Sequence, residues 1–332
     1  MATLYFTLGA AIIIVCIMDF LWTTLWVDGG AGTITKRASH LIWKTTRKIS
    51  KDHPKILSLN GPLILSFTLF TWIMLLWIGW TLVFAGDANS IINPQSSMPI
   101  TWLDRIYYAG YLIFTLGNGD FSPQGGTWKI ASVLATGTGM LFITLGVTYL
   151  LSILGAVTQK RAFSESVMAV GKDGEQFVLN AWNGKDFHDL NLLLNTLAEQ
   201  LGTITAQHKA YPILHYYYAE EKEEAIPNAV VVLDEALSVI CYGIERQAHP
   251  NPIVLRETRS TIKSYIKTLQ TVSFVPSKGI PPMINLDKFI EAKLPTLDAE
   301  LYKKDIASLK DRRKKLAGLL EANALEWPGD DR

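Results

Sequence analysis

Thr115-Leu116-Gly117-Asn118-Gly119-Asp120, the segment TLGNGD, separates two long apolar stretches and is itself too polar for the core of a membrane. Its two glycines alternate with other residues, and glycine adopts positive φ angles without a steric penalty. In such a conformation successive backbone carbonyls can point in the same direction. The flanking sequence therefore decides whether this segment is a surface turn or a lining of carbonyl oxygens.

The composition is typical of a membrane protein that also carries a polar folded part. Of the 332 residues, 49% are hydrophobic, and the mean hydropathy of +0.19 is high for a soluble protein of this length. The net charge of +1 gives no overall signature of nucleic-acid binding. Cys16 and Cys241 are far apart, so neither a disulfide framework nor a cysteine metal site is predicted.

Three stretches are long and apolar enough to cross a bilayer, which takes about 20 mostly apolar residues. They run from Leu4 to Val27, from Pro62 to Ala85 and from Trp128 to Val157. A retained first span is favoured over a cleaved signal peptide, because a basic start and a clear small-x-small cleavage site are missing. The apolar piece ITWLDRIYYAGYLIF (residues 100–114) is too short to cross and is predicted to be a re-entrant helix.

Loop charges predict the orientation in the membrane. Residues 28–61 carry seven Lys or Arg side chains, whereas residues 86–100 carry none. The positive-inside rule then places the N-terminus outside the cell membrane and the C-terminal half in the cytoplasm. The basic segment is expected to be either a helix on the inner leaflet or a solvated connector. Asp19, which is costly in lipid, is expected to face another helix or the interface in a structural role.

The residues after the re-entrant helix have the character of an ion-binding segment. A short helix that stops within the membrane directs the negative end of its dipole toward the centre, which favours a cation there. The chain is then expected to return as an extended strand over TLGNG, residues 115–119. Extended backbone at that depth is tolerated where it is buried in protein or lines a wet cavity. The carbonyls of residues 115–118 and the Thr115 hydroxyl would replace the hydration shell of a monovalent cation. One chain supplies one wall, so several copies must surround one axis.

The order of outer helix, pore helix, T-x-G-x-G-D segment and inner helix resembles the potassium-channel pore domain over about Pro62 to Gln159. The resemblance implies a homotetramer that conducts K⁺ passively, with no catalytic residues, no organic cofactor and no metal site besides the filter. It implies a selectivity filter made of Thr115, Leu116, Gly117, Asn118 and Gly119. It also implies that Asp120 bonds to the pore helix, and it puts Tyr107, Tyr108 and Tyr111 where support for the filter is expected.

The sequence departs from the family pattern at three positions. Asn118 stands where a Tyr or Phe usually braces the filter, Phe114 replaces a frequent second threonine, and Tyr111 occupies a position where some relatives carry glutamate. The backbone chemistry survives these changes. A weakly selective or non-selective monovalent cation channel is therefore an alternative to a K⁺-selective one.

The third span is predicted to line the pore. Gly137 or Gly139 is either a gating hinge or a site of close helix packing. Thr138, Thr144 and Thr148 are expected to face pore water. No span repeats Arg or Lys at every third position, so a voltage sensor is not predicted.

Residues 160–332 are predicted to form a mainly helical domain for regulation or assembly. Apolar residues from Phe187 to Ile204 recur at helical spacing behind Asp186, a possible cap. The remaining expected elements are helices at Asn228–Arg246, Ile253–Val272 and Thr296–Leu325 and a loop at Val275–Met283. Neither a strand followed by G-x-G-x-x-G nor an EF-hand or P-loop appears, so the sequence does not identify a gating ligand.

Two charged runs in this half have competing interpretations. YPILHYYYAEEKEE (Tyr211–Glu224) is interpreted as an aromatic core helix with a solvated acidic end, and a cation site at His215 and the glutamates is the alternative. The basic run Lys310–Lys315 is interpreted as a solvated helix face, with lipid contact as the alternative.

The sequence as a whole predicts an all-α membrane protein. Residues 1–27 form an N-terminal transmembrane helix, 28–61 a basic linker or interfacial helix, 62–159 the pore domain and 160–332 the cytoplasmic domain. Its expected partners are its own copies, membrane lipid and K⁺ or another monovalent cation, with no nucleic acid. A membrane-anchored signalling or scaffold protein is a second alternative, and a secondary transporter is a third.

Overall fold

The chain folds almost entirely into helices, and the predicted all-α membrane fold is confirmed. The computed structural model describes residues 1–26, 30–50, 53–95, 98–117, 119–270 and 274–329. Within them the strands are β1 (Ile91–Ile92) and β2 (Ser122–Pro123), which pair antiparallel. The chain divides into two compact units. The first comprises Met1–Lys44 and Pro62–Ile153, and the second comprises Thr45–Gly61 and everything from Leu154 onward.

The first unit contains the helices that the sequence predicts to cross the membrane, which are α1 (Ala2–Leu25), α4 (Asn60–Ala85) and the larger part of α6 (Gly125–Met168). It also contains the short re-entrant helix α5 (Trp102–Ile113) and the start of α2 (Thr33–Ser50). By length and hydropathy, the candidate spans among the described residues are α1, Lys55–Ala85, α6 and one helix of the second unit, α9 (Ile226–Gly243). Three of these four coincide with the predicted spans.

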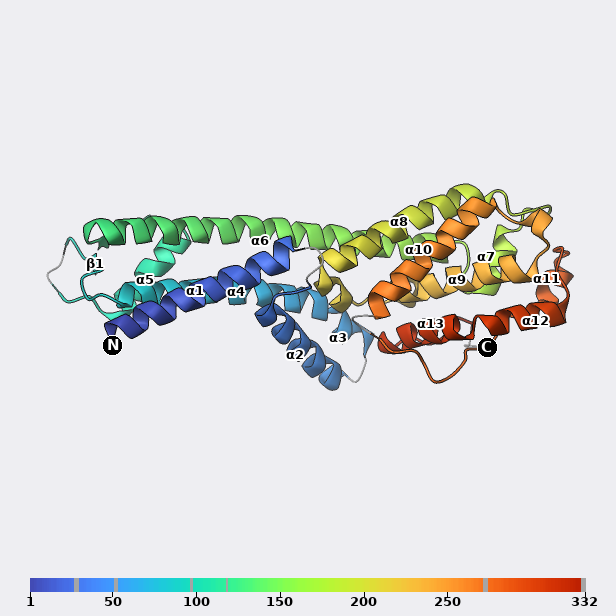
Figure 1. Cartoon of the computed structure of the whole chain (residues 1–332), viewed down its shortest axis with the longest axis horizontal. Helices are drawn as coiled ribbons and strands as arrows, with labels where there is room; N and C mark the ends of the chain where they lie inside the picture. Colours follow the sequence, from blue (N-terminus) through green and yellow to red (C-terminus); the bar gives the residue numbers. More distant parts are fainter. Residues whose placement is uncertain (27–29, 51–52, 96–97, 118, 271–273, 330–332) are drawn as a thin grey trace. The chain divides into compact units, whose positions relative to one another are not determined.

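Helices α1 and α4 lie side by side, with glycine at their contact (Figure 1). A Cβ atom on Gly9 would lie 2.6 Å from the carbonyl oxygen of Gly79, so no side chain fits between the two backbones. Small residues permit this close approach of helices in membranes. Phe20 extends the contact with an edge-to-face packing on Trp72, at 4.9 Å between ring centroids. The first apolar stretch is thus an integral part of the first unit.

Asp19 joins three helices, which confirms that it faces other helices. Its carboxylate accepts hydrogen bonds from the Ile34 N–H at 2.7 Å, the Thr35 hydroxyl at 2.6 Å and the indole N–H of Trp72 at 2.9 Å. The first N–H groups of a helix lack partners within that helix, and a carboxylate there satisfies them and complements the helix dipole. Asp19 is buried but supplied with donors on α2 and α4. It therefore fixes where α2 begins.

The second unit is built around α9, which is buried along almost its whole length. Around it lie α7 (Gly174–Ala181), α8 (Leu190–Ala210), α10 (Pro252–Gln270), α12 (Ala299–Ser308) and α13 (Lys310–Ala322) (Figure 1). Shorter elements are α3 (Pro54–Ser58), α11 (Asp287–Glu291) and the 3₁₀ turns η1 (Pro212–Tyr216), η2 (Lys222–Glu224) and η3 (Arg246–Ala248). Although α9 is apolar enough to cross a membrane, it is the core helix of this unit.

Two ion pairs from α13 to α9 show why the basic run 310–315 is not a solvated helix face. Arg312 binds both carboxylate oxygens of Asp234, and the buried Arg313 binds Glu235 through two bonds of 3.0 and 2.7 Å. Such bidentate pairs are the strongest that arginine forms with carboxylates. The interpretation of this run as solvated is therefore wrong for these two arginines, because their partners lie on a helix distant in sequence.

Two further expectations are corrected. The single helix expected at Thr296–Leu325 is two helices, because the chain turns at Leu309 before α13 presents its arginines to α9. Asp186 does not cap the following helix, which begins at Leu190 behind Asp189. Its side chain instead accepts a hydrogen bond from the His188 N–H at 2.9 Å and forms a local turn.

The substitution Asp19→Ala tests the junction of α1, α2 and α4. Without the acceptor, the first turn of α2 should open more often, because bonds to a charged group are worth about 1.5–3 kcal/mol. We expect trypsin to cleave after Lys36 and Arg37 at least about tenfold faster in the detergent-solubilised protein. Thr24→Ala is the matched control, because the Thr24 hydroxyl bonds to the Phe20 carbonyl of its own helix. Equal cleavage rates for the two variants would contradict this role of Asp19.

Candidate functional site

The site is built on α5, whose start is fixed by a capping box. The Thr101 hydroxyl accepts the Asp104 N–H at 3.3 Å, and the Asp104 carboxylate accepts the Thr101 N–H at 2.8 Å. These reciprocal bonds satisfy two groups that a helix N-terminus leaves without partners. With 12 residues, α5 is about 18 Å long and is too short to cross a bilayer core of about 30 Å.

Helices α4 and α6 hold α5 from two sides. The indole N–H of Trp77 on α4 donates to the Ile106 carbonyl at 2.8 Å. On the other side, the hydroxyl of Tyr108 on α5 lies 2.6 Å from the hydroxyl of Ser132 on α6. A Cβ on Gly139 of α6 would lie 2.5 Å from the Ile113 carbonyl oxygen, so α6 approaches the end of α5 backbone to backbone. The last turn of α5 is therefore placed by contacts with both neighbours.

The end of α5 leads directly into the TLGNGD segment. The N–H groups of Thr115 and Leu116 donate to the carbonyls of Leu112 and Tyr111 at 3.2 and 2.9 Å, which closes the helix. The φ angles of Thr115, Gly117 and Gly119 are +54°, +68° and +78°. Asn118 lies outside the described residues. The left-handed conformation is unfavourable for a β-branched residue such as Thr115, so the turn at the end of α5 holds it in a strained conformation.

This geometry changes one expectation for the segment. An extended strand was predicted from Thr115 onward, whereas Phe114 and Thr115 form a turn and Leu116 and Gly117 belong to no regular element. Leu116 has a side chain that is 60% exposed within one chain, although it is apolar. The described residues from Phe114 to Asp120 are all exposed, so little of the chain itself covers this segment.

Two of the three tyrosines support the residues that follow the glycines. The Tyr107 hydroxyl donates to the Asp120 carboxylate at 2.9 Å, which is the bond from Asp120 to the pore helix that the resemblance implies. The Tyr111 hydroxyl donates to the Phe121 carbonyl at 2.8 Å. Tyr108 differs from the expectation, because it is fully buried against Phe84 and Ser132 and faces α4 and α6.

Helix α6 has one covered and one uncovered face within the first unit. The covered face includes Ala135, Gly139, Phe142 and Tyr149. The large exposed apolar residues of this part of α6 recur at helical spacing and are Ile130, Val133, Leu134, Met140, Leu141, Ile143, Val147 and Leu151. Gly137 shares this exposed face, and so do Thr144 and Thr148, as a pore-facing position requires. Thr138 does not, because its hydroxyl accepts the Trp80 indole N–H at 3.0 Å.

The two glycines proposed as hinges differ in their surroundings. A Cβ on Gly137 would meet open space, whereas one on Gly139 would collide with the backbone of Ile113. Close packing therefore accounts for Gly139. A hinge role for Gly137 stays a prediction.

Ion pairs account for three of the four glutamates of the acidic run in the second unit. Glu220, Glu223 and Glu224 pair with Lys55, Lys172 and Arg161 at 3.5, 3.1 and 3.5 Å. Among the described residues no group of three His, Cys, Asp or Glu side chains is suited to hold a metal. The proposed cation site at His215 is therefore wrong. The expected helix over Tyr211–Glu224 is also wrong, because the run forms the 3₁₀ turns η1 and η2.

The sequence does not single out three residues that position the site. Trp77, Trp80 and Ser132 carry polar groups within apolar spans, and all three use them to hold α5 or α6. Polar groups in such spans need partners, so their presence indicates helix contacts. The presence of such a polar group in the sequence does not indicate which partner the residue binds.

Comparison with known proteins agrees with this geometry. The family described as "Ion channel" matches residues 67–156, which include α5, the TLGNGD segment and most of α4 and α6. A protein of Bacillus subtilis (strain 168), YdjJ, described as an uncharacterised membrane protein, is 46% identical over 324 residues, which are 98% of this chain and 95% of the relative. No solved structure matches the chain.

The substitutions Gly139→Ala and Gly137→Ala test the packing of α6 on α5. Gly139→Ala should lower the free energy of unfolding by about 1–3 kcal/mol, because the Ile113 backbone has to move to accommodate the methyl group. Gly137→Ala should be neutral or raise it by about 0.5–1 kcal/mol, because alanine favours the helix and meets no neighbour. Denaturant unfolding in detergent, followed by tryptophan fluorescence, measures both. Equal effects would contradict the packing described.

Proposed function

The chain belongs to the ion-channel family, and we propose that it forms a homotetramer that conducts K⁺ through residues 115–119. The observation that carries the proposal is the positive φ at Thr115, Gly117 and Gly119, directly behind a helix too short to cross the membrane. Left-handed residues that alternate with others turn successive carbonyls to the same side of the chain. Four such rows around one axis form rings of oxygen that replace the hydration shell of K⁺.

Helix α5 contributes to this proposed function through its dipole. Its C-terminal end leads into the filter at Thr115, so the partial negative charge of the last carbonyls lies next to the path of the ion. Trp77, Ser132 and Gly139 hold that end in place from α4 and α6. A rigid frame of this kind keeps the oxygen rings at the spacing that a dehydrated cation needs.

The exposed surfaces of one chain support assembly around an axis. The uncovered apolar face of α6 and the exposed Leu116 lack partners in the described part of the chain. In the proposed tetramer these surfaces face the pore and the neighbouring copies. Gly137, Thr144 and Thr148 share the uncovered face, so this face would line the inner cavity.

The proposed topology follows the distribution of basic residues. The chain is a membrane protein, and we place it in the cell membrane with its N-terminus outside. The exposed Lys36, Arg37 and Lys44 on α2 then lie at the inner leaflet, where anionic lipid attracts them. The second unit lies in the cytoplasm and is available for regulation.

A weakly selective monovalent cation channel is the second candidate. Asn118 favours it, because its short polar side chain replaces the aromatic ring expected at this position. The tyrosines of α5 brace Asp120 and Phe121, which follow the filter residues. The oxygen rings then depend on backbone conformation more than on side-chain packing.

Ion flux into liposomes tests conduction. Protein reconstituted into vesicles with a K⁺ gradient should pass K⁺, and Gly117→Ala should reduce the flux at least about tenfold, because alanine at positive φ costs about 1–2 kcal/mol and turns the filter carbonyls. Gly126→Ala is the matched control, because it meets open space at the start of α6 and lies outside the filter. Absence of both K⁺ and Na⁺ flux in the native protein, or unchanged flux in Gly117→Ala, would contradict the proposal.

A further inference from the structure

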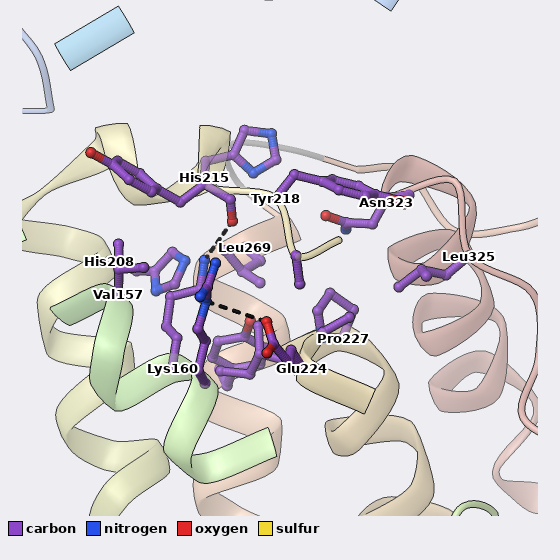
Figure 2. A pocket seen from close by; sticks show the side chains of 16 residues that line it. Val157, Lys160, His208, His215, Tyr218, Glu224, Pro227, Leu269, Asn323 and Leu325 are labelled. Carbon is purple, nitrogen blue, oxygen red and sulfur yellow. Dashed lines mark hydrogen bonds and ion pairs between the residues drawn. The ribbon is translucent and has the colours of Figure 1, made fainter. Parts of the chain in front are cut away.

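A cavity in the second unit lies where α6, α8, α10 and η1 meet the start of α9 (Figure 2). Its polar lining includes Lys160, Arg161, His208, Tyr217 and Tyr265, and Val157, Pro227 and Leu269 supply apolar walls. None of these residues belongs to the proposed filter. The cavity therefore needs an explanation of its own.

Lys160 is the buried cation of this cavity. Its side chain is almost fully enclosed, and its Nζ atom donates to the carbonyls of Leu214 at 2.9 Å and Tyr217 at 3.2 Å. An ammonium group has three N–H donors. Carbonyls of described residues therefore satisfy two of these three donors, and no carboxylate of a described residue pairs with Lys160. A buried charge without a counterion is unfavourable.

Two tyrosines that line the cavity have hydroxyls without partners. The hydroxyls of Tyr217 and Tyr265 are buried and form no hydrogen bond within the described part of the chain. Tyr265 has no exposed surface at all, so bulk solvent does not reach its side chain. Buried polar groups are nearly always hydrogen-bonded in native proteins, and each exception needs a ligand or a water molecule to explain it.

The charges of the remaining groups leave Lys160 uncompensated. Burial, and secondarily the charge of Lys160, lowers the pKa of His208 to about 3 and that of His215 to about 4, so both imidazoles are neutral at physiological pH. Arg161 is paired with Glu224 at 3.5 Å. Burial, and secondarily the charge of Arg161, lowers the pKa of Lys160 to about 8, so most of this ammonium is protonated at pH 7.5. The cavity consequently carries close to one net positive charge and several unused hydrogen-bond donors.

We propose that this cavity binds a small oxyanion, either a carboxylate or a phosphate. Its oxygens accept hydrogen bonds from the third N–H of the Lys160 ammonium and from the Tyr265 and Tyr217 hydroxyls, which are the donors without a partner among the described residues. Water would satisfy the hydroxyls but would not neutralise the buried ammonium. The space open to water is about 40 Å³. That is room for roughly three water molecules, which suits a small anion and excludes a nucleotide.

The position of Lys160 links this site to the pore. Lys160 lies on α6, the helix whose earlier residues line the proposed inner cavity, and its bonds hold η1 against that helix. An anion that binds the Lys160 ammonium changes the hydrogen bonds of that group to the carbonyls of Leu214 and Tyr217. We therefore expect the bound oxyanion to alter the open probability of the channel, and this consequence rests on the function proposed above.

Calorimetry on the full-length protein in detergent at pH 7.5 tests the site without reference to conduction. Inorganic phosphate and acetate are titrated at constant ionic strength, with chloride as the control anion. Binding of either oxyanion, with none for chloride, is expected. Tyr265→Phe should weaken binding about tenfold, because it removes a bond to a charged group. This variant also removes an unsatisfied buried hydroxyl, so it is expected to fold.

Matched variants separate the site from general effects. Lys160→Gln should abolish measurable binding, whereas Lys263→Gln, on the exposed face of α10, should leave it unchanged. Tyr302→Phe, a buried tyrosine outside the cavity, is the control for Tyr265→Phe. Absence of binding of both oxyanions, equal heats with chloride, or native affinity in Tyr265→Phe would overturn the proposal.

A flux measurement on the same preparations distinguishes the two proposals. If the oxyanion binds and changes K⁺ flux in the native protein but not in Tyr265→Phe, the regulatory consequence is supported. If the oxyanion binds but no cation flux occurs under any condition, the proposed channel function fails and the binding site stands. If K⁺ flux occurs and neither oxyanion binds, the site is wrong and the channel proposal stands.

Discussion

The TLGNGD segment imposes the constraint on which the first unit depends. The backbone of its described residues Thr115 to Gly117 and Gly119 lies outside any helix, between α4 and α6, which are long and apolar enough to cross a membrane. Hydrocarbon offers no hydrogen-bond partners, so such backbone persists only where protein holds it and water or ions satisfy its carbonyls. The protein meets the first condition with contacts on both sides of α5. Trp77 holds the middle of α5 from α4, Ser132 holds Tyr108 from α6, and Gly139 lets α6 reach the carbonyl at the end of α5. The second condition would be met by a row of cations that binds the backbone carbonyls.

The same physical rule explains the polar groups found elsewhere within apolar or buried helices. Asp19 is tolerated because α2 and α4 direct donors at it, and Arg313 is tolerated because Glu235 meets it with two bonds. In each case hydrogen bonds satisfy the buried charge, from neutral donors at Asp19 and from an opposite charge at Arg313. Lys160 departs from this pattern, since two carbonyls bind its ammonium group, no opposite charge pairs with it, and two tyrosines that line the same cavity have buried hydroxyls without partners. That difference is the physical reason for assigning an anion to its cavity.

The sequence was sufficient to predict the spans, the short helix α5 and the left-handed conformation that Gly117 and Gly119 permit, because each follows from a local property such as run length or residue type. Contacts between distant segments were not predictable in this way. Nothing local shows that Tyr108 faces Ser132 while Tyr107 faces Asp120, although the two tyrosines are neighbours. Likewise, the basic run 310–315 resembles a solvated helix face until α13 is seen to meet the carboxylates of α9. The pairing of Glu224 with Arg161 corrected the cation-site hypothesis for the same reason.

The selectivity of the proposed channel depends on residue 118. There the side chain and the neighbouring backbone lead to different expectations. In the proposed tetramer the left-handed conformations of Gly117 and Gly119 would provide oxygen rings, whereas Asn118 stands where the resemblance leads us to expect an aromatic brace. The reversal potential of the reconstituted protein, with K⁺ on one side of the bilayer and Na⁺ on the other, tests this account most directly. We predict a reversal potential displaced strongly toward the K⁺ equilibrium potential. A reversal potential near zero, which means equal permeability to the two ions, would contradict it.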